Sequence, residues 1–309
     1  METKTMRRMR VALLSVAAWG SSAAWAAGVG TTGADFLKFG VGARGLAMGS
    51  AFISVVDDAN AIYWNPGALG AIGKRSLTAS YGALFQDENQ GFLGYINPLR
   101  DNGGTLGVGL DYLVVSNIEK RAAESEAPDS SISNQNFALS GSYGCNTAVT
   151  GLSVGGNLKY IRETLDTFSG NAVALDAGAL YKTPVPELTS GLVLQNFGTK
   201  IGPDVLPMTV KGGASYRMFQ QRLTLASDVD WLAQDQRVYW DLGTEFWVHP
   251  SLAVRAGYQF GHGQDQLDSA LVGTSFGVGL YIERFRIDYA FLPFGNLGDT
   301  HRMSLGWMF

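Results

Sequence analysis

The sequence predicts an all-β fold: a transmembrane outer-membrane β-barrel of about 14 antiparallel strands with an N-terminal hatch (plug) segment. Three observations predict it. The chain begins with an export signal, its composition is low in charge and rich in glycine and aromatic residues, and from residue 76 onward apolar residues alternate with small or polar ones. The predicted parts are a signal peptide (1–26), the hatch (27–75) and the barrel (76–309).

Residues 1–26 have the features of a secretory signal peptide. A basic head containing Arg7, Arg8 and Arg10 precedes a short apolar run, and Ala24-Trp25-Ala26 offers the small residues that signal peptidase cuts after. The apolar run is well short of the roughly 20 residues that a membrane-spanning helix needs. We therefore expect export and exclude this part from the fold.

The composition suits strands that face lipid on one side. Charged residues make up 16% of the chain, below the roughly 25% of soluble domains. The chain also holds 40 Gly, 16 Phe, 12 Tyr and 7 Trp. The net charge of −4 and the lack of a basic block predict no nucleic-acid partner.

In the predicted barrel, residues 76–309, apolar residues alternate with small or polar ones along each strand. In the stretch 152–160 the apolar Leu152, Val154, Leu158 and Tyr160 share one face of a strand, because successive side chains point to opposite sides. The same pattern predicts strands near 76–86, 89–97, 104–116, 134–144, 151–162, 170–182, 187–197, 207–218, 221–232, 236–248, 251–261, 268–280, 283–292 and 300–309.

An even strand number puts both ends of the barrel on one side, which we expect to be the periplasm. The predicted connections on that side are all short. On the other side they are mostly longer and polar, at 117–133, 162–169, 197–206, 261–268 and 292–300. Short periplasmic turns and long outer loops are typical of such barrels.

The polar face of each strand should line the lumen, since a charge facing lipid at the midplane costs about 2–4 kcal/mol for Arg or Lys. Both signs of charge occur there, so we expect a paired network rather than a charge-selective pore. The predicted network is Lys159, Asp176, Lys211, Arg217, Asp228, Asp230, Asp241, Glu245, Arg255, Arg286 and Asp288.

The C-terminal strand places Leu305, Trp307 and the final Phe309 on one face. A last strand that ends on phenylalanine resembles the signal read by the barrel assembly machinery, so this machinery and outer-membrane lipid are the expected partners. The alternative, a soluble β-sandwich or propeller, fits poorly, because a soluble domain would carry more charge and has little reason to end on an exposed aromatic residue.

The segment 27–75 is too rich in glycine and too irregular to continue the strand pattern, while its apolar residues favour packing in the lumen. A polar, turn-forming set interrupts it. Asp57 and Asp58 can cap a short helix, and Asn65-Pro66-Gly67 is a strong turn signal. We expect Arg44, Asp57, Asp58, Asn65 and Pro66 to hold the segment inside the barrel.

Nothing in the sequence indicates an enzyme, a cofactor or a metal. The stretch 40–45 fits G-x-G-x-x-G but lacks the strand before it and the helix after it that dinucleotide binding requires. His249, His262 and His301 are scattered without the spacing of metal ligands, and no serine is marked as the partner of a catalytic histidine.

The longest recognisable pattern runs from Ala34-Asp35-Phe36-Leu37-Lys38-Phe39-Gly40 through Asp57-Asp58-Ala59-Asn60-Ala61-Ile62-Tyr63-Trp64-Asn65-Pro66-Gly67. With Gly156–Ile161, Ala174–Tyr181 and Gly191–Gly198 it resembles the PorV/PorQ family. That family is similar in turn to FadL-type fatty-acid transporters, which are fourteen-stranded barrels whose N-terminal hatch carries Asn-Pro-Ala. Asn65 and Pro66 match this motif, and Gly67 departs from it.

The resemblance implies two functions. One is a PorV-like component of protein export that binds exported cargo proteins and passes them to surface attachment. The other is a FadL-like channel for hydrophobic small molecules, which leave the lumen when the hatch shifts. A third possibility is a structural barrel that organises envelope partners. The sequence leaves all three open.

Overall fold

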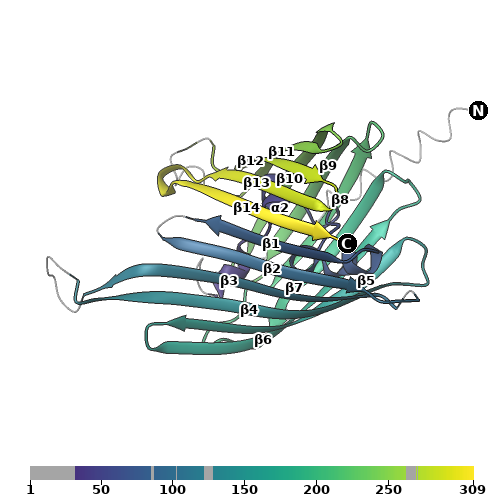
Figure 1. The fold of residues 1–309 in the computed structure, drawn as a ribbon. Coiled ribbons are helices and arrows are strands. Elements are labelled where there is room, and N and C mark those ends of the chain that lie inside the picture. The colour runs from purple at the N-terminus through teal and green to yellow at the C-terminus, as the bar shows by residue number, and fades with distance from the viewer. Residues whose placement is uncertain (1–31, 85–86, 102, 122–127, 262–268, 270) are drawn as a thin grey trace, which may run out of the picture.

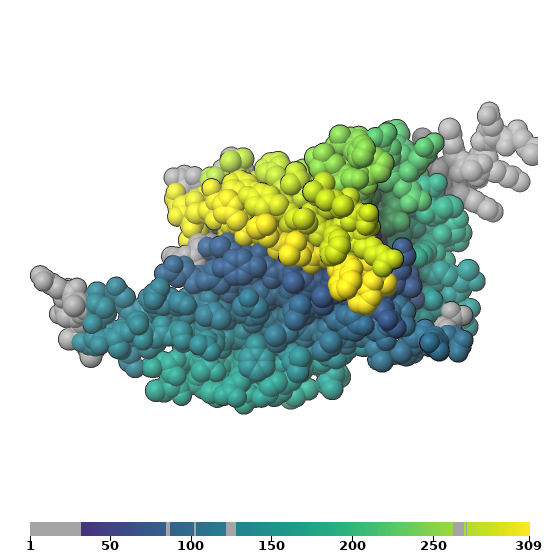
Figure 2. All heavy atoms as spheres, in the orientation of Figure 1, coloured from purple at the N-terminus to yellow at the C-terminus, as the bar shows by residue number. Residues whose placement is uncertain are grey.

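The computed structural model describes residues 32–84, 87–101, 103–121, 128–261, 269 and 271–309. Within them, 14 antiparallel strands form one closed barrel. The first strand, β1 (Ser76–Ala83), pairs with the last, β14 (Asp299–Met308), and so closes the ring. Figure 1 shows these two strands side by side, and in Figure 2 their atoms form a continuous wall. The predicted fold class is confirmed, whereas the predicted signal peptide lies outside the described residues.

Each strand pairs with its neighbours in sequence. The other strands are β2 (Glu88–Pro98), β3 (Thr105–Lys120), β4 (Ser130–Asn146), β5 (Leu152–Leu165), β6 (Phe168–Lys182), β7 (Leu188–Gly198), β8 (Thr209–Met218), β9 (Leu223–Leu232), β10 (Arg237–His249), β11 (Leu252–Phe260), β12 (Thr274–Ile282) and β13 (Phe285–Pro293). The short helices are η1 (Asp35–Lys38), α2 (Ala43–Ala47), α3 (Ala61–Trp64), η2 (Pro66–Ala71) and η3 (Gly295–Leu297). No helix of the described part of the chain is long and apolar enough to cross a membrane.

Two predicted outer loops, 117–133 and 162–169, were too long. Strand β3 continues to Lys120 and pairs there with the start of β4, while β5 and β6 continue to the pair of Leu165 with Phe168. These stretches are polar, and a polar stretch between two strands predicts a loop. A ladder is made of backbone hydrogen bonds, however, so strands that project into water can carry polar side chains on both faces. The predicted start of β12 at 268 was also wrong, because Gly273, with φ of 89°, still belongs to a turn.

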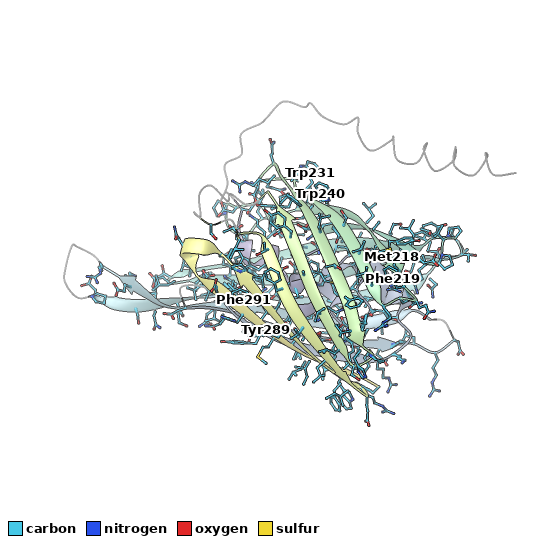
Figure 3. All side chains as sticks on the ribbon, turned by 90° about the horizontal axis from the view of Figure 1, so that it is seen from above. Met218, Phe219, Trp231, Trp240, Tyr289 and Phe291 are labelled. Atoms are coloured by element: carbon cyan, nitrogen blue, oxygen red, sulfur yellow. The ribbon has the colours of Figure 1, made fainter. Side chains whose placement is uncertain are left out.

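The two faces of the strands are as predicted. On β5, Leu158 is 58% exposed while its neighbour Lys159 is buried, and on β9 Leu225 is exposed while Asp228 is buried. Aromatic side chains occur near both ends of this apolar exterior, as Figure 3 shows for Trp231, Trp240 and Phe291 toward one end and Phe219 at the other. Aromatic girdles of this kind mark the two interfaces of an outer membrane.

The start of β1 and the end of β14 lie at the same end of the barrel, where every connection is short. By the usual asymmetry this is the periplasmic end. The C-terminal residues extend the closure, because the Phe309 backbone N–H donates to the carbonyl of Arg75. Leu305, Trp307 and Phe309 all lie on the lipid-facing side, and the Trp307 ring stacks on Phe285. Their part in barrel assembly stays a prediction.

Residues 32–75, here called the luminal segment, fill the inside of the barrel. The segment begins at the outer end, where Thr32 bridges to Val205, and reaches the periplasmic end before β1. On the way α2 packs against β11 to β14, and η2 packs against β3 to β6 on another part of the wall. Most of its side chains are buried, and Phe52, Ile62 and Trp64 belong to the main apolar core.

Candidate functional site

A cavity of about 310 Å³ lies in the outer half of the lumen, between the luminal segment and the barrel wall. Its apolar lining comes mainly from the luminal segment, with further side chains from β9, β13 and the β13–β14 connection. The apolar lining includes Leu37, Phe39, Leu46, Tyr63, Trp64 and Leu292. An apolar cavity with a few polar groups is the usual form of a small-molecule site.

Trp64 is held in a fixed orientation beside this cavity. Its indole Nε1 donates to the carbonyl of Val41 at 2.9 Å, and Phe52 and Tyr63 meet its ring edge to face. The ammonium group of Lys211 lies 5.4 Å from the centre of the same ring. The apolar wall is therefore preformed.

A larger hollow of about 650 Å³ lies elsewhere, on the outside of the barrel across β8 to β11. Small outward side chains, among them Ala214, Ser227 and Ala256, leave it shallow, and exposed Tyr216 and Leu225 border it. This hollow faces the membrane, so acyl chains fill it, whereas the luminal cavity is screened from lipid by the barrel wall.

An ionic cluster joins the luminal segment to the wall formed by β10 to β13. The Arg44 guanidinium donates to both oxygens of Glu245, at 2.7 and 2.9 Å, and to Asp57 at 2.7 Å. Arg286 donates to Asp58 at 2.8 Å. Arg255 completes the cluster by bridging Glu245 and Asp288. Bidentate pairing of a guanidinium with a carboxylate fixes geometry as well as charge.

Asp57 stands where this cluster meets water, with 48% of its side chain accessible. Burial raises the pKa of its carboxyl, but the positive charges of Arg44 and Arg286 outweigh that effect and hold the pKa below its ordinary value. The carboxylate is therefore charged at neutral pH. Neither acid is the helix cap that we expected, because Asn60 precedes α3 and Asp58 accepts instead from the backbone and side chain of Asn60.

Asn65 and Pro66 lie at a second attachment, on the opposite side of the segment. The Asn65 side-chain amide donates to the carbonyls of Ile53 and, across on β6, Ala179. Its oxygen accepts from the backbone N–H of Gly67 and so caps η2, which begins at Pro66. The structure thus places the five predicted residues in two attachments, three in the ionic cluster and two at η2.

The close approach of η2 to β6 explains why position 67 is a glycine. A Cβ there would lie 2.6 Å from backbone atoms of Gly178 and Ala179, far closer than real contacts allow. An Asn-Pro-Ala sequence would push η2 away from the wall in this barrel.

The other residues of the predicted lumen network fall into smaller groups. Lys159 pairs with Asp176 at 2.8 Å, and Lys211 pairs with Asp230. Asp228 accepts from the backbone N–H groups of Phe52 and Ile53, and Asp241 lies opposite Asp228 on the next strand. Arg217, in contrast, is only half-buried at the periplasmic rim.

The sequence analysis missed several polar residues that border the cavity or lie close to it, among them four charged residues. Arg302 lines the cavity, and Lys38 of η1 bridges to Asp235 at 2.7 Å over its outer end. Asp111 lies behind Arg302 in the barrel wall. The alternation of β3 and β14 could have found Asp111 and Arg302, because both occupy inward positions. No group of three or more His, Cys, Asp or Glu that could hold a metal occurs in the described part of the chain.

Comparison with known proteins gives fold-level matches. No protein-family model matches the chain, and no curated protein does. Among solved structures, the toluene transporter TbuX of Ralstonia pickettii matches with a TM-score of 0.54 and 12% identity over 87% of this chain and 97% of its own. The monoaromatic hydrocarbon channel CymD matches with a TM-score of 0.57 and 11% identity, over 87% and 96%. A deltaS2 mutant of the monoaromatic hydrocarbon channel TodX gives 0.50 and 13%, over 87% and 97%.

The chain has the fold of FadL-type hydrocarbon transporters. Its closed strand ring and apolar exterior, together with these matches, make it a barrel of the bacterial outer membrane. The matched proteins are a transporter and channels rather than enzymes. The resemblance to PorV/PorQ finds no matching family model.

Proposed function

We propose that this protein is a FadL-like channel, without enzymatic activity, for hydrophobic small molecules. The observation that carries the proposal is the luminal cavity of about 310 Å³, which is screened from lipid by the barrel wall and lined by apolar side chains of both the luminal segment and the wall. The shared fold with a toluene transporter and monoaromatic hydrocarbon channels supports it.

In this proposal residues 27–75 form a hatch that closes the lumen. The ionic cluster of Arg44, Asp57 and Asp58 with the wall, and the η2 attachment at Asn65 and Pro66, hold the hatch in place. A ligand that leaves the cavity toward the periplasm must pass these contacts, so the hatch has to shift for each passage.

The test is uptake of radiolabelled p-xylene by intact cells whose own hydrocarbon channels are deleted. Leu292 points into the cavity, whereas its neighbour Phe291 points to lipid. We expect Leu292→Trp, which fills the cavity, to reduce uptake about tenfold, while the matched Phe291→Trp leaves it unchanged. Equal uptake by both variants at equal amounts in the membrane would refute the channel.

A PorV-like role in protein export is supported only by the sequence resemblance of the luminal segment and of three stretches in β5 to β7. A structural envelope role has no feature of its own. A pull-down from outer-membrane fractions separates the three. Exported proteins recovered with the barrel would favour export, envelope proteins alone would favour the structural role, and the channel predicts neither.

A further inference from the structure

The cavity contains a buried positive charge that has no carboxylate within 4.0 Å among the residues that the structure describes. Six lysines and arginines are buried in the described part of the chain, namely Arg44, Lys159, Lys211, Arg255, Arg286 and Arg302. The first five each have a carboxylate within 4.0 Å. Arg302, which is only 8% exposed and lines the cavity, has none among the described residues.

The surroundings of Arg302 leave part of its guanidinium unused. Its Nη1 donates to Gln90 Oε1 at 2.7 Å, whereas its Nε has no hydrogen-bond partner within the described residues. Gln90 in turn donates to Asp111 at 3.1 Å, so the closest acid along these hydrogen bonds is one side chain removed. An unpaired buried charge is costly, which favours a ligand that supplies the missing anion.

The side chain is also held in place by the fold. Arg302 crosses over Gly82 of β1 to reach Gln90 of β2, and a Cβ at Gly82 would lie 2.1 Å from Arg302 Cδ. Glycine at this position therefore lets the guanidinium lie across the neighbouring strand at the cavity wall.

Two of the other basic side chains that line the cavity are already paired with carboxylates. Lys38 and Lys211 are paired with Asp235 and Asp230. Arg237, half-buried in the lining, adds a further positive charge without a carboxylate within 4.0 Å among the described residues. The cavity thus offers an apolar, largely aromatic wall and a positively charged side.

We propose that Arg302 binds the carboxylate of the preferred ligand, and that this ligand is a small aromatic acid, which binds more tightly than a plain hydrocarbon of the same size. A water molecule occupies about 30 Å³, so a cavity of about 310 Å³ holds a ligand of about ten non-hydrogen atoms, the size of one substituted ring. Tyr63 and Trp64 provide the aromatic wall against which the ring would pack. The inference rests on the proposed function.

The test compares two probes of equal size, 4-methylbenzoate and its neutral amide, by equilibrium dialysis against the full-length protein in lipid nanodiscs, with empty nanodiscs as the blank. A charge-assisted hydrogen bond predicts about ten- to hundredfold tighter binding of the acid. Arg302→Gln should reduce the preference about tenfold, because Arg237 is then the only cavity-lining cation without a carboxylate within 4.0 Å among the described residues, and Arg302→Lys should restore part of it. Arg217→Gln, at the periplasmic rim, should leave the preference unchanged. Heat-dependent gel mobility shows whether each variant is folded.

Equal binding of acid and amide by the wild type, or an undiminished preference in Arg302→Gln, would overturn the assignment. A purely structural Arg302 would alter barrel stability without changing the ratio of the two affinities. If p-xylene uptake still depends on Leu292 while the acid shows no preference, the channel stands and the aromatic acid is wrong. If p-xylene uptake does not depend on Leu292 and the acid is not preferred over the amide, both the channel and the aromatic acid are wrong.

Discussion

At the scale of single residues, Glu245 is the centre of the contact between the luminal segment and the wall. It is 1% exposed and accepts hydrogen bonds from two guanidiniums, those of Arg44 and Arg255. A carboxylate shared by two buried cations offsets their desolvation only while it stays charged. Glu245 thus gives both Arg44 and Arg255 a carboxylate partner. Arg302, in contrast, has no such partner among the described residues that line the cavity.

We expect Glu245→Gln to lower the free energy of unfolding by about 3 kcal/mol, because the neutral amide leaves the two arginines facing each other without their shared anion. Urea titration in detergent, followed by the heat-dependent shift in gel mobility, measures the change. The matched control is Glu187→Gln in the exposed β6–β7 turn, which forms no salt bridge among the described residues. Equal midpoints for the two variants would show that the cluster contributes nothing to stability.

At the scale of elements, glycines let the luminal segment approach the strands. Beneath η2, a Cβ at Gly155 would lie 2.2 Å from the carbonyl oxygen of Pro66, and one at Gly178 would lie 2.3 Å from the Asn65 side chain. Beneath the turn after α2, a Cβ at Gly257 would lie 2.0 Å from the backbone nitrogen of Gly49. The high glycine content is thus partly a requirement of close packing inside the barrel.

Gly67→Ala tests this packing with a single methyl group. Its Cβ would meet the backbone of β6, so we expect a loss of about 1–3 kcal/mol through displacement of η2. Gly73→Ala is the matched control, two residues after the end of η2. Nothing lies within 4 Å of a Cβ there, so we expect a change below about 0.5 kcal/mol. The same urea titration compares them, and equal stability would mean that η2 can move away without cost.

At the scale of the whole molecule, the luminal segment decides whether the barrel is open. Barrels of eight strands fill their interior with side chains, and those of sixteen or more leave a water-filled channel. A ring of 14 strands lies near the wide end of this range, so its lumen needs an additional filling.

Deletion of 27–75 should therefore convert a barrel with little conductance into an open pore. We expect single-channel conductance in planar bilayers to rise about tenfold or more once the lumen holds only strand side chains. Heat-dependent gel mobility must first show that the deleted protein still forms a barrel. Unchanged conductance of a folded deletion variant would mean that the segment does not close the lumen.

The alternation of apolar and polar residues within each strand was sufficient to predict the wall of the barrel. The alternation of Leu158 with Lys159, or of Ile287 with Asp288, predicts which side faces lipid because the strand period is two. The same rule located the inward charges. It failed for the projecting ends of β3 to β6, where both faces meet water and the alternation carries no signal.

The sequence by itself determined the class of the molecule, its strand number and the polarity of its two surfaces, since each follows from side chains within one strand. Only the tertiary structure decided which charges meet. Arg44 and Glu245 are 201 residues apart, and Arg302 and Gln90 are 212 apart. Their contacts depend on ring closure and on the path of the luminal segment. For the same reason the sequence does not show that Arg302, alone among the buried arginines and lysines of the described residues, lacks a carboxylate within 4.0 Å.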